Sequence, residues 1–285
     1  MIVSKIQGGL GNQMFQFATA FAVDTPVYLD LEFINEKTES TESFTKRNFA
    51  LELFPNLRYR ELSSFKRKIF FSNNAIYKHL RKLSQITTVT QKDNQIVQIP
   101  AANNIYLDGY FQSEQYFVSK RNEILQQFQF PKLDQQNQSL KEKILATPNS
   151  VAIHVRRGDY LKPTVAQYHG ILPLSYYEQA ISYLQHRLVE LDLVIFSDDP
   201  QFCRLHFEKY NNVYIVSGND AASWKDMSLM SACQHHIIAN SSFSWWGAWL
   251  SQHSNGIKIA PKNWFNNEVV DYNIDDIIPN SWIKI

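Results

Sequence analysis

Two adjacent arginines and an aspartate directly follow an apolar segment at residues 150–155. Removing two neighbouring guanidinium groups from water is expensive unless anions compensate them. We therefore expect at least one of Arg156 and Arg157 to face a carboxylate or a phosphate, whose geometry a guanidinium matches with two parallel hydrogen bonds. Asp159 could pair with the other arginine and orient it. A purely structural ion pair at the end of a strand is the alternative interpretation.

A glycine-rich loop near the N-terminus offers a second anion-binding pattern. The sequence GGLGNQ at residues 8–13 lies between a short apolar segment and apolar residues at helical spacing. Because Gly9 and Gly11 lack side chains, backbone N–H groups there can approach an anion at a helix N-terminus, and Asn12 follows directly. The loop is neither a GxGxxG nor a Walker motif. A tight structural turn explains this segment equally well.

Two more polar loops follow apolar segments in the second half of the chain. Ser197, Asp198 and Asp199 follow residues 193–196, and a carboxylate there can accept hydrogen bonds from a base such as guanine or from ribose hydroxyls. The two aspartates are adjacent rather than spaced for joint metal chelation. The second loop contains Asn240, Ser241, Ser242 and Phe243. Phosphate binding and a helix N-cap are both open for these two loops.

The elements that position these loops are clearest after residue 149. Apolar segments at 150–155, 193–196, 213–216, 236–239 and 257–260 alternate with helical patterns. Such alternation predicts a doubly wound, Rossmann-like sheet, whose ligands bind beyond the carboxyl ends of the strands. Ser175 and Glu178 also have the spacing of a capping box. On one of the helices we expect three tryptophans to pack in the core, namely Trp245, Trp246 and Trp249.

The first half opens as a strand at 2–6, the glycine loop, a helix and a second strand near 27–31. This order also predicts a parallel sheet with crossover helices. Residues 32–100 are polar and mixed in periodicity, with helical hints only around 61–83. The turn-forming sequence TPNS near residue 148 is the best boundary signal, so we predict an N-terminal domain at 1–148 and a C-terminal domain at 149–285.

The composition limits the classes of partner. Lys and Arg number 28 against 27 Asp and Glu, so no global field favours nucleic acid. Cys203 and Cys233 fit neither a disulfide framework nor a zinc site, and we expect them to be buried thiols. Neither a signal sequence nor a membrane-spanning segment is evident, which predicts a cytoplasmic protein. The basic and aromatic segment at 65–71 allows peripheral membrane association, although a solvated helix face is the simpler interpretation.

Taken together, the motifs resemble the bacterial alpha-1,2-fucosyltransferases of glycosyltransferase family eleven. The resemblance rests on GGLGNQMFQFA at 8–18, GYFQSEQYF at 109–117, HVRRGDY at 154–160, FSDDP at 196–200 and NSSFSWWGAWL at 240–250. It implies a GT-B-like α/β fold of two Rossmann-type domains facing a cleft, with the donor bound by the C-terminal domain. The HxRRxD element is similar to one in alpha-1,6- and protein O-fucosyltransferases, which use GDP-fucose.

The resemblance also implies roles for individual residues. Arg156 corresponds to the arginine that binds the β-phosphate of GDP, and Arg157 is secondary. His154 and the turn at 197–199 are implied to lie near the guanosine, with phosphate contacts from residues 241–243. Finally, Gly9, Gly11 and Asn12 are implied to approach the diphosphate and the fucose from the N-terminal domain.

The implied reaction moves L-fucose, with inversion, from GDP-β-L-fucose to the 2-hydroxyl of a terminal β-galactoside in a surface glycan. Arginine and helix dipoles would replace a metal ion at the leaving diphosphate. Asp159 and His169 are candidate bases by chemistry, and the choice between them stays open. The alternatives are a fucosyltransferase with another linkage or acceptor and a non-catalytic glycan-binding protein. The oligomeric state is not predictable.

Overall fold

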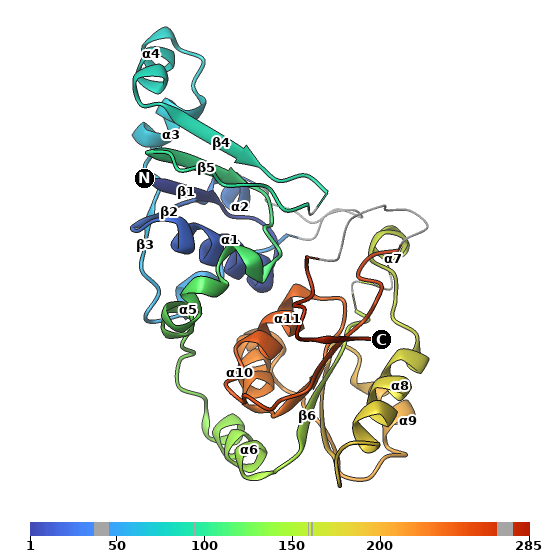
Figure 1. Cartoon of the computed structure of the whole chain (residues 1–285). Helices are drawn as coiled ribbons and strands as arrows, with labels where there is room; N and C mark the ends of the chain where they lie inside the picture. The colour runs from blue at the N-terminus through green and yellow to red at the C-terminus, as the bar shows by residue number, and fades with distance from the viewer. Residues whose placement is uncertain (37–45, 94, 159, 161, 267–275) are drawn as a thin grey trace. The chain divides into compact units, whose positions relative to one another are not determined.

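The computed structural model describes residues 1–36, 46–93, 95–158, 160, 162–266 and 276–285 (Figure 1). The chain forms two compact units that divide between Pro131 and Lys132. The segment from Ile278 to the C-terminus belongs to the second unit. Among these residues, no helix is long and apolar enough to span a bilayer.

Unit 1 is a parallel α/β unit. Its described part holds a five-stranded sheet in the order β3-β2-β1-β5-β4, and every neighbouring pair is parallel. The central strand β1 is buried and pairs with β2 on one side and β5 on the other. The elements are β1 (Ile2–Lys5), α1 (Leu10–Val23), β2 (Val27–Asp30), α2 (Glu32–Glu36), β3 (Tyr59–Glu61), α3 (Ser64–Phe71), α4 (Ala75–Leu83), β4 (Ile86–Thr90), β5 (Asn104–Asp108) and α5 (Arg121–Gln127).

Unit 2 has the same design. Its described part holds a six-stranded parallel sheet in the order β11-β10-β9-β6-β7-β8. The elements are α6 (Gln135–Ala146), β6 (Ser150–Val155), α7 (Pro163–His169), α8 (Leu174–Gln185), β7 (Asp192–Ser197), α9 (Pro200–Phe207), β8 (Val213–Ile215), α10 (Trp224–Ala232), β9 (His235–Ile237), α11 (Ser242–Trp249), β10 (Lys258–Ala260) and β11 (Ile283–Lys284). The predicted alternation of strands and helices is confirmed.

The sheet of unit 2 is covered on both faces. Val151, Ile153 and Val155 of β6 pack into one hydrophobic cluster with residues of α8 and α9. Ala152 belongs to a second cluster, which includes residues of α6 and α10. A strand that is buried on both faces needs an unbroken apolar run, which explains why β6 was readable from the sequence. All three predicted core tryptophans of α11 are buried.

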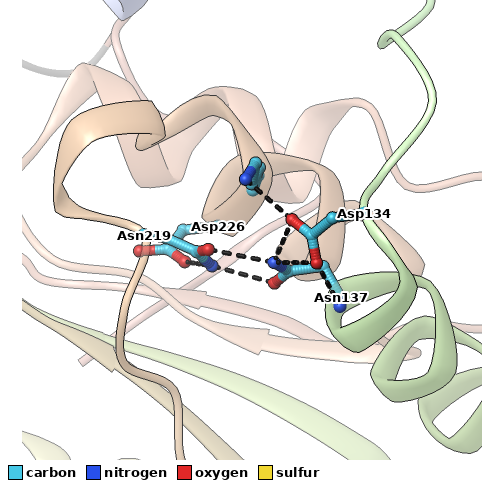
Figure 2. A network of polar contacts seen from close by, with 5 residues as sticks. Asp134, Asn137, Asn219 and Asp226 are labelled. Atoms are coloured by element: carbon cyan, nitrogen blue, oxygen red, sulfur yellow. Dashed lines mark hydrogen bonds and ion pairs between the residues drawn. The ribbon is translucent and has the colours of Figure 1, made fainter.

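Helix α6 packs in unit 2, so the predicted boundary near residue 148 falls inside this unit. A network of polar side chains joins α6 to α10 and the segment before it (Figure 2). Asn137 and Asn219 exchange two amide hydrogen bonds of 3.0 and 2.9 Å, and the amide of Asn219 also donates to Asp226 at 2.7 Å. Asp134 caps α6 by accepting from the backbone N–H of Asn137 at 3.0 Å.

The structure corrects one further prediction, on helix α8, and defines a region that the sequence left unassigned, where α3 and α4 confirm the helical hints around 61–83. Helix α8 begins at Leu174 with Pro173 at its N-cap position, so Ser175 is not the capping residue. The region at 32–100, which had only helical hints, contributes β3, α3, α4 and β4 to unit 1. Cys203 and Cys233 are buried and form no disulfide, as predicted. The α/β class, with two Rossmann-type parallel sheets, is confirmed as well.

Candidate functional site

The two arginines follow β6, at the carboxyl end of the sheet of unit 2. Strands β6 and β7 pair in parallel with Val155 opposite Ser197, so the next residues of both strands lie side by side. Nη1 of Arg156 lies 2.8 Å from Oδ2 of Asp198. In the second pair, Nε of Arg157 donates to Oδ2 of Asp199 at 3.1 Å. The carboxylates found beside the arginines are therefore those of the β7–α9 turn. Asp159, the predicted partner, lies outside the described residues.

Asp198 also fixes the backbone that carries the arginines. Its Oδ1 accepts hydrogen bonds from the backbone N–H groups of Arg157 at 2.8 Å and Gly158 at 3.0 Å. A Cβ atom on Gly158 would lie 2.7 Å from Oδ2 of Asp198, closer than side chains tolerate. Glycine at 158 is thus needed for the close approach of Asp198. The carboxylate predicted to contact guanosine is in this structure bound to the arginine loop.

Arg157 is anchored on a second side. Its guanidinium lies 3.8 Å from the ring centroid of Phe202 in α9. Asp199, its ionic partner, is the N-cap of α9 and accepts from the backbone N–H of Phe202 at 3.0 Å. This hydrogen bond, together with Arg157, lowers the pKa of the Asp199 carboxyl. The predicted N-cap role of this loop is confirmed for Asp199, whose own N–H donates to the hydroxyl of Ser197 at 2.9 Å.

His154 lies two residues before Arg156 and is 7% exposed. Desolvation, reinforced by the nearby guanidinium of Arg156, lowers the pKa of His154 to about 3. The ring is therefore neutral near pH 7, and its Nδ1 has no hydrogen-bond partner within the described part of the chain. The ring centroid of Phe243 lies 5.8 Å away. A neutral imidazole with one unused nitrogen can donate to or accept from a ligand without adding charge.

The loop between β9 and α11 contributes Asn240 to Phe243. Ser241 is the N-cap of α11, since its hydroxyl accepts from the backbone N–H of Phe243 at 3.3 Å. Ser242 begins the helix at the same carboxyl edge of the sheet, because β9 pairs in parallel with β6. Asn240 is buried, and its amide donates to the carbonyl oxygens of His169 at 2.9 Å and Trp264 at 3.2 Å. In this structure, the Asn240 amide contacts the protein's own backbone.

Tyr160 connects this loop to the arginines. Its hydroxyl donates to the carbonyl oxygen of Asn240 at 3.0 Å, and the guanidinium of Arg156 lies 5.6 Å from its ring centroid. His169, one of the two candidate bases, stacks on Tyr160 with centroids 4.8 Å apart and also contacts Phe265. The imidazole of His169 is thus part of an aromatic cluster beside the arginine loop.

The glycine loop lies at the carboxyl edge of the sheet in unit 1. Gly8 has a φ of +79°, and a Cβ there would lie 2.5 Å from Nδ2 of Asn12, so this position requires glycine. Gly9 is the N-cap of α1 without a side-chain cap, and Gly11 is buried in the first turn. Oδ1 of Asn12 accepts a hydrogen bond from Gln112 at 2.8 Å. The loops after β1 and β5 are therefore joined, as expected for neighbouring parallel strands.

Each unit therefore gathers its predicted residues at one edge of its sheet. In unit 2 this edge combines two guanidinium groups, two carboxylates, a neutral histidine and a helix N-terminus, which suits a phosphorylated ligand. Among the described residues, no cluster of three or more His, Cys, Asp or Glu side chains is placed to hold a metal ion. Reasoning from the sequence missed Gly158, Tyr160 and Phe202 as site residues. The available signals were the places of Gly158 and Tyr160 within the HVRRGDY motif and the nearness of Phe202 to the FSDDP motif.

Comparisons with known proteins agree on one family. The model of the family described as glycosyl transferase family 11 matches residues 2–285. An alpha-1,2-colitosyltransferase of Escherichia coli is 32% identical over 304 residues, covering 100% of this chain and 99% of that protein. The O-antigen biosynthesis glycosyltransferase WbnK of Escherichia coli is 32% identical over 308 residues and covers 99% of both chains. A galactoside alpha-(1,2)-fucosyltransferase 1 of Lagothrix lagotricha is 32% identical over 104 residues, 35% of this chain and 28% of that protein.

Solved structures show a weaker likeness. The NodZ alpha-1,6-fucosyltransferase soaked with GDP-fucose gives a TM-score of 0.48 at 14% identity, over 87% of this chain and 91% of that chain. A glycosyl transferase family 9 protein from Veillonella parvula gives a TM-score of 0.48 at 11% identity, over 100% of this chain and 85% of that chain.

Proposed function

We propose a specific reaction for this chain, which belongs to glycosyl transferase family 11 and is therefore a glycosyltransferase. In this proposal the chain transfers L-fucose from GDP-β-L-fucose to the 2-hydroxyl of a terminal β-galactoside with inversion. The observation that carries the proposal is the arginine pair after β6. Arg156 and Arg157 stand at the carboxyl end of a parallel sheet and pair with carboxylates of the β7–α9 turn. Cations arranged in this way can stabilise the charge that develops on a departing nucleoside diphosphate.

In this proposal Arg156 binds the β-phosphate. Its side chain is 26% exposed and that of Arg157 is 23% exposed, but the guanidinium of Arg157 also lies over the ring of Phe202. The N-terminus of α11 supplies backbone N–H groups and the positive end of a helix dipole to the same diphosphate. Neutral His154 lies at the guanosine side, where its Nδ1 can form a hydrogen bond. Because these groups supply positive charge without a divalent cation, we propose metal-independent transfer.

We propose that charge stabilisation of GDP contributes more to catalysis than deprotonation of the acceptor. An oxocarbenium-like transition state needs only weak assistance at the acceptor hydroxyl, because most of its charge develops at the leaving group. The stacked ring of His169 fits a structural role beside Tyr160 better than that of an exposed base. Substrate isotope effects indicating strong participation by the acceptor oxygen would contradict this view.

The related proteins suggest an alternative to fucose as the transferred sugar and a class of acceptor. The related alpha-1,2-colitosyltransferase raises colitose as the competing transferred sugar. The relation to an O-antigen glycosyltransferase supports an acceptor in a surface polysaccharide. Parallel reactions with GDP-L-fucose and GDP-colitose, followed by NMR of the product linkage, would separate these possibilities.

The central experiment measures GDP release from GDP-fucose, with lactose or N-acetyllactosamine as acceptor and EDTA present. We expect turnover by the wild type and a loss of roughly a hundredfold or more in Arg156→Ala, about 3 kcal/mol of transition-state stabilisation. Arg187→Ala is the matched control, because Arg187 is an exposed arginine of the same unit that packs on Tyr183. Equal turnover in Arg156→Ala and Arg187→Ala would contradict the proposed site, and complete inhibition by EDTA would contradict metal independence.

A further inference from the structure

A strongly basic segment lies in unit 1, outside the loops of the proposed donor site. Residues 62–92 contain seven Lys and Arg residues and no Asp or Glu, although the whole chain has a net charge of only +1. The segment comprises α3, α4 and β4. Charge of one sign is therefore concentrated on this part of unit 1, where α4 lies beyond the edge strand β4 (Figure 1).

Helix α4 presents its apolar side chains to solvent. None of its residues is buried, and Ile76 and Leu83 are 69% and 68% exposed. Ile76, Leu80 and Leu83 recur at helical spacing, so they form one apolar stripe along the helix. In an ordinary surface helix such a stripe faces the core, whereas here its two ends are open to solvent.

The exposed stripe belongs to an ordered pair of helices. Nε and Nη2 of Arg81 donate to the carbonyl oxygens of Ile69 at 2.8 Å and Ser72 at 2.7 Å, which ties α4 to the C-terminal end of α3. The rings of Phe65 and Tyr77 meet edge to face with centroids 6.2 Å apart. Phe65, itself exposed, thus extends the apolar surface from α4 to α3.

The lysines of α4 lie on its polar face, because Lys78 and Lys82 follow Ile76 and Leu80 by two residues, about 200° around the helix. Among the described residues, no hydrogen bond or ion pair engages the ammonium groups of Lys68, Lys78 or Lys82, and all three residues are exposed. Other cations of the segment are already engaged, since Arg67 pairs with carboxylates of unit 1 and Lys66 lies over the ring of Tyr28. The α3–α4 pair therefore combines an exposed apolar stripe with a basic polar face, the pattern of helices that lie in a membrane interface.

We infer that this α3–α4 surface, defined by Phe65, Lys68, Ile76, Lys78, Lys82 and Leu83, binds an anionic lipid bilayer. Anionic headgroups would neutralise the lysines while the apolar side chains enter the boundary between headgroups and acyl chains. Lysines dispersed over two helices suit a fluid surface, because lipids move to each charge. A folded acidic partner would instead need carboxylates at fixed positions. The inference goes beyond the proposed transfer reaction, since it concerns where the enzyme works.

The test is co-sedimentation of the full chain with vesicles of phosphatidylcholine alone or with one-fifth phosphatidylglycerol. We expect binding to the anionic vesicles only, falling as salt is raised, because salt screens the attraction to the headgroups. Equal binding to both compositions, or binding to neither, would overturn the inference.

Paired variants identify the surface. Lys78→Gln with Lys82→Gln should lower the partition coefficient about thirtyfold, because each lysine near an anionic surface contributes roughly fivefold. Ile76→Ser with Leu83→Ser should lower it at least about tenfold. The matched control is Val189→Ser with Leu205→Ser, two side chains of unit 2 that are 84% and 80% exposed.

Two measurements separate the other outcomes. Turnover with a soluble acceptor should be unchanged in all three double variants, so loss of vesicle binding would not be confused with loss of the transferase site. Light scattering after gel filtration reports self-association. A dimer that is abolished by Ile76→Ser with Leu83→Ser would assign the surface to a second copy of the chain and overturn the lipid assignment. The lipid assignment would also be overturned if Val189→Ser with Leu205→Ser lowered vesicle binding as much as Ile76→Ser with Leu83→Ser does.

Discussion

Replacing Asp198 with asparagine tests whether this carboxylate acts through Arg156 or on the substrate directly. Asparagine keeps an oxygen for the N–H groups of Arg157 and Gly158, which lie 2.8 and 3.0 Å from Oδ1. It replaces the other oxygen, 2.8 Å from Nη1 of Arg156, with an NH₂ group that faces another donor. The variant therefore removes the ionic contact of Asp198 with the Arg156 guanidinium while it leaves the backbone contacts possible.

The expected loss has two parts. A hydrogen bond between charged groups contributes about 1.5–3 kcal/mol, and the quarter exposure of this pair places the loss of stability at the lower end. Activity should fall further, because displacing a substrate-positioning group by about 1 Å can cost roughly a hundredfold in rate. We expect kcat/KM for GDP-fucose to fall about 10- to 100-fold and the free energy of unfolding in urea by about 1–2 kcal/mol.

A double-mutant cycle makes the prediction refutable. If Asp198 works by placing Arg156, Asp198→Asn should have little further effect on donor kcat/KM once Arg156 is alanine. Full additivity would show that Asp198 contacts the donor independently. Gly158→Ala offers a steric route to the same disturbance, because its Cβ would lie 2.7 Å from Oδ2 of Asp198. Increased donor affinity in Asp198→Asn would refute the positioning role and identify Asp198 as a competitor of the diphosphate.

Two other predictions concern stability, measured by urea unfolding. Gly8→Ala should destabilise the chain by about 1–3 kcal/mol, and by more than Gly218→Ala does. Both glycines have positive φ, but only the new Cβ at Gly8 would collide with another side chain, that of Asn12. Equal losses in the free energy of unfolding would contradict the collision. Burial lowers the pKa of His236 to about 3, so its contribution to stability should decline by about 1.4 kcal/mol per pH unit as the pH falls from about 6.5 toward 3. His236→Gln, whose amide can still donate to the carbonyl oxygen of Met230, should flatten this decline, and an unchanged slope would contradict it.

Reasoning from the sequence succeeded where local pattern and tertiary burial agree. The strand at 150–155 is buried on both faces, so its apolar run was unbroken and ended where the charged loop begins. The ionic partners of the arginines were not predictable in this way. Asp198 and Asp199 lie some forty residues further along the chain, and only the pairing of β6 with β7 brings them beside Arg156 and Arg157. Asp159, nearer in sequence, was the natural but untested choice.

Predictions of helix and domain boundaries were wrong where tertiary packing, rather than a local sequence pattern, sets the boundary. Ser175 has the spacing of a capping box, yet α8 already begins at Leu174 after Pro173. The turn signal near residue 148 marks the loop before β6 rather than the division between the units. Helix α6 belongs to unit 2 through long-range contacts, which include the pairing of Asn137 with Asn219 and the packing of Ile144 in the hydrophobic cluster with α10. Helix α4 could not be assigned in detail from the sequence for another reason, which is that its apolar stripe does not face a core.

The contacts of the two arginines support a larger role in diphosphate binding for Arg156 than for Arg157. Arg157 is held by Asp199 and by the ring of Phe202, and Asp199 is itself fixed as the N-cap of α9. Moving Arg157 toward a ligand would therefore also disturb a helix terminus. Asp198, which pairs with Arg156, is not the N-cap of α9, and the Arg156 guanidinium lies 5.6 Å from the centroid of Tyr160, farther than Arg157 lies from Phe202. Contact of Arg156 with a diphosphate, beside Asp198, would therefore leave this helix terminus undisturbed, which is why the Arg156→Ala loss should exceed that of Arg157→Ala.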